Sequence, residues 1–145
     1  MKKFSFGKPF MALAILLLVL VFGLAFVGCK NEVEDDPLNG TYVTSVNELI
    51  LNNGTWSLKI TGNDYQRGTY EASDGNITLT VTDMNFDSGM ASQFNTTVGW
   101  KTRSQLIEFL RNAGYSDAEI GAELTPTGTY SGNTITFGNT VFTRN

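Results

Sequence analysis

The sequence predicts a mainly β protein, an antiparallel meander that closes into a barrel of about eight or nine short strands and carries a two-helix insertion. Three observations support this prediction. Apolar and polar residues alternate with a period of two from Gly40 onward. Glycine and asparagine turn signals punctuate the alternation. One later stretch changes to a period of about 3.6 residues, which is typical of helices. At 145 residues the chain accommodates one domain with appendages.

The first 28 residues have the layout of a secretory signal. Three lysines among the first ten residues precede an apolar run at 10–27, and a basic start before an apolar run is typical of such signals. The run is also close to the length at which a helix spans a membrane, so an uncleaved anchor is the alternative. Gly28 and Cys29, the single cysteine of the chain, end the run.

The stretch "FVGC" at residues 26–29 resembles the lipobox of bacterial lipoproteins. The resemblance implies that the Cys29 thiol receives a diacylglycerol, that the signal is cut before Cys29, and that the new amine is acylated with a chain such as palmitate. Several acyl chains together form an anchor that does not readily leave a membrane. The resemblance therefore implies a protein of the bacterial cell envelope, held by lipid at the outer membrane or the cell surface.

Residues 29–39 are expected to form an acidic tether. Glu32, Glu34, Asp35 and Asp36 repel one another and provide almost no apolar surface, so the stretch is expected to stay extended. Binding of calcium or of a cationic partner is the alternative. Three of the ten basic residues lie in the signal, which leaves seven against fourteen acidic residues. This balance argues against nucleic acid as a partner.

The domain is expected to span residues 40–145 and to begin with a run of strands. "TWSLKIT" and "NITLTVT" alternate apolar with polar residues, the pattern of strands that have one face in water. Turn signals such as Asn53-Gly54, Asp74-Gly75 and Gly132-Asn133 separate successive runs. We expect strands near residues 41–46, 48–52, 55–61, 65–73, 76–84, 94–98, 127–131, 134–137 and 140–144.

The turns also predict which residues face one another. A three-residue loop at 62–64 sets Trp56 opposite Tyr70 and Leu58 opposite Gly68. The Asp74-Gly75 turn then sets Tyr70 opposite Leu79 and Gly68 opposite Val81. The turn at Gly132-Asn133 sets Tyr130 opposite Ile135. We therefore expect Trp56, Tyr70 and Leu79 to form one row across three strands, where cross-strand contacts stabilise a sheet.

Two short helices are expected within residues 102–124. Thr102 with Gln105, and Ser116 with Glu119, have the spacing of capping boxes, in which two side chains satisfy the first backbone groups of a helix. Pro126 stops the second helix. We expect the pair to plug one end of the barrel or to cover an open sheet edge; a motif that docks a partner is the alternative.

Three stretches of the domain resemble the lipocalin-like domains of small bacterial lipoproteins. They are "LNGTY" at 38–42, "NNGTWSLKITGNDYQRGTYEASDGNITLTVT" at 52–82 and "TGTYSGNTITFGNTVFTR" at 127–144. The resemblance covers residues 38–145 and implies an antiparallel barrel that holds a small apolar ligand. The expected partners are therefore the membrane, through Cys29, and a small hydrophobic ligand or an envelope or host macromolecule.

Large side chains are expected inside the barrel. Barrels of about eight strands have interiors that side chains can fill. The alternative function is therefore a filled-core structural or protein-interaction module without a ligand cavity. The candidate interior residues are Trp56, Leu58, Ile60, Tyr70, Leu79, Val81, Ile135 and Phe137.

The sequence offers little for catalysis, and we expect neither an enzyme nor a cofactor. Histidine, the commonest general base, is absent, and the lone thiol is assigned to lipid. The best metal candidate is "DMNFDSG" at 83–89, whose alternate oxygen ligands resemble a calcium loop. Ser88 stands where such a loop needs glycine, and Phe94 where it needs glutamate. A polar loop after a strand is therefore the preferred interpretation.

Overall fold

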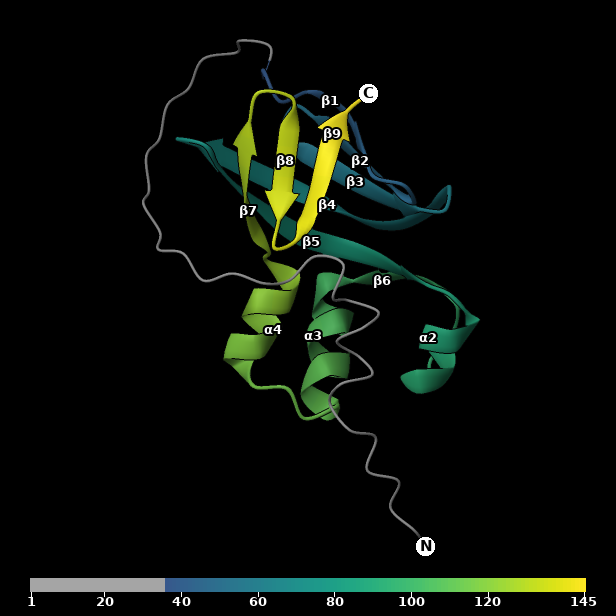
Figure 1. Ribbon diagram of the computed structural model, residues 1–145. Coiled ribbons are helices and arrows are strands. Elements are labelled where there is room, and N and C mark those ends of the chain that lie inside the picture. The colour runs from purple at the N-terminus through teal and green to yellow at the C-terminus, as the bar shows by residue number, and fades with distance from the viewer. Residues whose placement is uncertain (1–35) are drawn as a thin grey trace, which may run out of the picture.

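The computed structural model describes residues 36–145, so the predicted signal and most of the predicted tether lie outside the described residues. Within this range the chain forms nine strands and three helices (Figure 1). The strands are β1 Gly40–Val43, β2 Asn47–Asn52, β3 Thr55–Ile60, β4 Asn63–Ser73, β5 Asn76–Phe86, β6 Gly99–Thr102, β7 Thr127–Ser131, β8 Thr134–Phe137 and β9 Thr140–Arg144. The helices are α2 Ser88–Gln93, α3 Arg103–Asn112 and α4 Asp117–Leu124.

Eight of these strands close into an antiparallel barrel. Their order is β4-β3-β2-β1-β9-β8-β7-β5, and pairing of β4 with β5 closes the ring. The ninth, β6, lies outside the ring and pairs with the C-terminal end of β5. The predicted mainly β barrel with a helical insertion is thus confirmed, and it is consistent with a lipocalin-like architecture.

Strand β5 serves two parts of the molecule because it is eleven residues long. Residues 76–78 pair with β7 inside the ring, whereas residues 83–86 pair with β6 outside it. The edge of β5 between these two stretches is closed by Arg103, at the start of α3. Its Nη1 donates hydrogen bonds of 2.8 Å to the carbonyl oxygens of Val81 and Leu124. The helical insertion therefore covers an open sheet edge, as expected.

The predicted helix caps are confirmed. Both capping boxes are formed, by Thr102 with Gln105 and by Ser116 with Glu119. Figure 1 shows α3 and α4 side by side at the end of the barrel away from the C-terminus. Helix α2 was not expected, and the strand predicted at 94–98 is wrong. The Asp87 side chain accepts a 2.9 Å hydrogen bond from the Met90 backbone N–H, which starts a helix where a loop was expected.

The predicted pairing of Trp56 with Tyr70 is also wrong. Ile60 pairs with Asn63, so the turn has two residues, Thr61 and Gly62, and both have positive φ. Such two-residue turns match the twist of antiparallel strands. A bulge at Tyr65 in the same hairpin shifts the register back by one residue, which is too little to restore the predicted pairing. The outcome is that Trp56 faces Gly68, and Leu58 faces Gln66.

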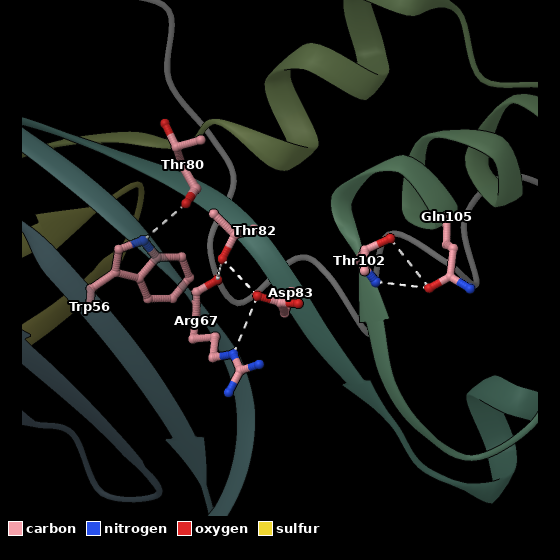
Figure 2. A network of polar contacts seen from close by, with 7 residues as sticks. All are labelled: Trp56, Arg67, Thr80, Thr82, Asp83, Thr102 and Gln105. Carbon is pink, nitrogen blue, oxygen red and sulfur yellow. Dashed lines mark hydrogen bonds and ion pairs between the residues drawn. The ribbon is translucent and has the colours of Figure 1, made fainter.

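Other predicted pairs are confirmed. Tyr70 faces Leu79, Gly68 faces Val81, and Tyr130 faces Ile135. Gly68 is needed for close packing rather than for its φ angle. A Cβ atom there would lie 1.8 Å from the Thr80 carbonyl oxygen. The Trp56 indole covers the same spot and donates a 3.3 Å hydrogen bond to that oxygen (Figure 2).

Four residues of the predicted tether belong to the folded domain. Leu38 is buried, and the Tyr42 hydroxyl donates a 3.0 Å hydrogen bond to its carbonyl oxygen. Asp36 accepts a hydrogen bond from the Tyr70 hydroxyl. Arg144 donates to the carbonyl oxygen of Pro37 at 2.9 Å. The segment 36–39 is therefore fixed against the barrel rather than extended into solvent.

Candidate functional site

Side chains fill the barrel interior. Seven of the eight residues predicted to lie there are 0–6% exposed, and the eighth, Ile60, is partly buried against the same core. Tyr42, Leu49, Leu51 and Phe142 add further bulk and are at most 1% exposed. A barrel of this strand number is just wide enough for its own side chains. The interior is therefore a packed core.

A small cavity lies outside the barrel, between the C-terminal half of β5 and the helices. Its volume is about 20 Å³ and its lining is wholly apolar. That exceeds the roughly 10–15 Å³ that one water needs, but is far below the roughly 300–1,000 Å³ of drug-sized ligand sites. None of the eight predicted interior residues lines it. The lining residues are Met84, Phe86, Met90, Phe94, Leu106, Phe109, Leu110 and Leu124.

A β-bulge in β5 creates this lining. Arg67 pairs with Asp83 but the next residue, Gly68, pairs with Val81, so Thr82 is an extra residue in β5. Buried positions therefore run 77, 79, 81 and then 84, 86. Without the bulge, strict alternation would turn residues 83 and 85 toward the helices. The bulge instead turns Met84 and Phe86 toward them.

The same bulge determines on which face of β5 the residues of the calcium-like motif lie. Asp83 and Asn85 are half-buried side chains on the face of β5 away from Met84, and Asp87 caps α2. Their alternate spacing is that of a strand followed by a helix cap. Among residues 36–145 no group of three His, Cys, Asp or Glu side chains is placed to hold a metal ion.

The cavity wall is aromatic and only partly sealed. Phe86, Phe94 and Phe109 form a cluster with ring centroids 5.4 to 5.8 Å apart. Phe94, Phe109 and Met90 are partly buried, in contrast to the fully buried barrel residues. Helix α2, which supplies Met90, has six residues, of which Ala91 alone is buried. Segments with few buried apolar contacts open at low free-energy cost, so we expect this wall to open more easily than the barrel interior.

Two buried polar groups flank Met84 in the sheet. Met84 pairs with Gln66 on β4 and with Lys101 on β6, and all three are buried. Gln66 is 3% exposed, and its Oε1 accepts no hydrogen bond from the described residues. Lys101 is 5% exposed, and its Nζ donates a 3.0 Å hydrogen bond to Thr97 Oγ1. The face of the sheet that carries the apolar cavity therefore also carries a buried ammonium group.

The opposite face of the same strands carries an exposed aromatic patch. The Arg67 guanidinium lies 4.3 Å from the ring centroid of Trp100. Its Nε is 3.3 Å from Asp83 Oδ2 (Figure 2). Thr82 Oγ1 is 2.9 Å from that carboxylate oxygen and 3.2 Å from the Arg67 carbonyl oxygen. Trp100 is 39% and Val98 62% exposed. Tryptophan and arginine are enriched among residues that dominate protein interfaces.

Burial raises the pKa of two tyrosines and one glutamate of the domain. Burial raises the pKa of Tyr65 to about 12, and the negative charge of Asp87 adds to the effect. Burial also raises the pKa of Tyr70, together with its hydrogen bond to Asp36. Both phenols therefore stay protonated. Burial and the nearby Glu119 raise the pKa of Glu123 on α4.

Cys29, the predicted site of lipid attachment, lies outside the described residues. Within residues 36–145, none of the helices is long and apolar enough to cross a membrane. Comparison of the chain with models of protein families, with curated proteins and with solved structures finds no match.

Proposed function

We propose that this chain is a lipid-anchored protein of the bacterial cell envelope whose domain binds a small hydrophobic ligand. The apolar cavity between β5 and the helices carries the binding part of the proposal. The ligand lies there, and not in the barrel, because the interior residues already pack against one another. The basic and apolar start of the chain and its "FVGC" stretch support the anchor.

Ligand entry requires the cavity to expand. Met90 and Phe94 lie at the partly sealed wall, and methionine adapts its shape because its side chain has three rotatable bonds. Outward movement of α2 and the residue after it enlarges the cavity without disturbing the barrel ladder. Burial of the ligand's apolar surface stabilises the complex by about 25 cal/mol per Å² of buried area.

Native mass spectrometry of the protein extracted from membranes tests the binding proposal. We expect a stoichiometric apolar ligand that leaves on denaturation, unlike covalent acyl chains. Met90→Trp should fill the cavity and abolish the adduct, whereas Val141→Trp, at an exposed site on β9, should retain it. A bare protein mass, or an adduct that survives Met90→Trp unchanged, would contradict the proposal.

The anchor is tested by Cys29→Ser. The substitution removes the only thiol, so we expect loss of labelled palmitate incorporation and accumulation of uncleaved precursor, measured by radiolabelling and intact mass. Persistence of both labelling and cleavage would overturn the lipoprotein assignment while leaving the cavity untouched.

The exposed patch of Trp100, Arg67 and Val98 favours a second candidate function, a protein-interaction module. Trp100 presents apolar area next to a cation, a combination common at binding hot spots. A photo-crosslinker at position 100 should then capture one defined partner in intact cells. The same crosslinker at the exposed position 141 is the control. Equal products from both positions would count against a specific interface.

A further inference from the structure

Lys101 is a positively charged side chain next to the cavity in the sheet. It lies directly opposite Met84, which lines the cavity, and both side chains are buried on the face that the helices cover. Its ammonium reaches Thr97, in the segment between α2 and β6. Thr97 follows α2 and Phe94 in the chain, and Met90 and Phe94 line the cavity, so the ammonium contacts the segment that continues from this cavity wall.

The ammonium is poorly satisfied by the protein itself. A lysine ammonium carries three N–H donors, and among the described residues Lys101 makes one hydrogen bond, to the neutral Thr97 hydroxyl. Burial of a charge is costly unless a partner compensates it. A carboxylate supplies both an opposite charge and several acceptor lone pairs. Its chemistry therefore matches what Lys101 lacks.

We infer that the ligand is a short-chain carboxylic acid, with its apolar chain in the cavity and its carboxylate on Lys101. The inference rests on the proposed function, since it assigns a head group to the same ligand. Lys101 is not among the residues that line the cavity, so the carboxylate lies beside the cavity and the apolar chain lies inside it. The chain is short because the cavity is small and because α2, which supplies Met90 to its wall, is six residues long.

Another role of Lys101 makes a different prediction. An inward-pointing charge on an edge strand discourages that strand from pairing with other chains, and β6 pairs only with β5. In that role Lys101 affects self-association and leaves the choice between charged and neutral ligands unchanged.

Calorimetric titration with hexanoate and with its neutral counterpart hexanol separates these roles. In the wild-type full chain, hexanoate should bind about 10- to 100-fold more tightly than hexanol, the effect of charge-assisted hydrogen bonds. Lys101→Met keeps the side-chain length and an apolar environment, so it should fold, bind hexanol as before and lose the preference for hexanoate. Lys59→Met, on β3, is the matched control and should retain the preference.

The outcomes distinguish the inference from the function on which it rests. If neither compound binds the wild type, the proposed binding function fails. If both bind the wild type equally, or if the hexanoate preference survives Lys101→Met, the carboxylate assignment fails while the apolar site stands. Circular dichroism of each variant establishes that a lost preference does not reflect unfolding.

Discussion

The barrel interior and the small apolar cavity beside it, the crevice, are both lined by strand β5, but they are packed differently. Inside the barrel, β5 contributes Leu79 and Val81, which are 0–1% exposed among other fully buried side chains. Three residues after Val81 the strand contributes Met84, and then Phe86, to the crevice, whose other wall includes partly buried residues. The difference puts the proposed binding site beside the barrel rather than inside it. The bulge at Thr82 turns Met84 and Phe86 toward that site, and α2, with one buried residue, covers it.

The two regions also differ in the side chains they use. Close-packed side chains, including the edge-to-face pair of Phe137 and Phe142, fill the barrel, so its packing resists change. Two methionines, Met84 and Met90, line the crevice, and methionine adapts its shape more readily. We therefore assign stability to the barrel and ligand binding to the crevice.

The largest expected effect contrasts two phenylalanines. Phe137→Ala empties a fully buried barrel position and should lower the free energy of unfolding by about 3–5 kcal/mol. Phe94→Ala removes a partly buried ring beside the cavity and should cost less than about 2 kcal/mol while it enlarges the site. Urea unfolding monitored by circular dichroism measures both. Equal losses would break the contrast between core and crevice.

Gly68→Ala tests the bulge that turns Met84 toward the crevice. The new methyl would collide with the Thr80 carbonyl and the Trp56 indole, so we expect a loss of about 1–3 kcal/mol and a change in tryptophan fluorescence. Gly121→Ala is the matched control. It lies in α4 with open space around it, and alanine should stabilise the helix by about 1 kcal/mol. Stabilisation by both substitutions would show that Gly68 is not closely packed.

A smaller effect is expected at Gln66, at the border between the two regions. Its buried Oε1 accepts no hydrogen bond from the described residues, and an unsatisfied buried carbonyl costs about 1–3 kcal/mol. Gln66→Leu removes this group with little change in volume and should raise the free energy of unfolding by about 1 kcal/mol. Thermal unfolding of the variant checks the sign; destabilisation would indicate that the amide is satisfied in solution.

The smallest effect is expected on the outer face. Arg67 contacts Asp83 and Trp100 there, but its side chain is 52% exposed, and exposed ion pairs contribute about 0–1 kcal/mol. Arg67→Ala should therefore change stability by less than about 1 kcal/mol and leave ligand binding unchanged. Loss of ligand binding by this variant in calorimetric titration would mean that the two faces of the sheet are coupled.

Local sequence patterns predicted the strands and helices better than they predicted the cavity proposed as the binding site. Alternation and capping boxes gave the strands and the pair α3 and α4, because those signals act over a few residues. The bulges at Tyr65 and Thr82 were not predicted, since an inserted residue shows only in the pairing with a neighbouring strand. The cavity was missed for the same reason. One signal was present: apolar Met84 and Phe86 fall out of phase with Leu79 and Val81.

The central claim is that an apolar ligand binds in the crevice and not in the barrel. Nuclear Overhauser contacts between bound hexanol and labelled methyl groups of the protein test it most directly. We predict contacts to the methyl groups of Met84, Met90 and Leu106, which line the cavity. Contacts to Leu79, Val81 and Ile135 instead would place the ligand in the barrel interior and contradict the account.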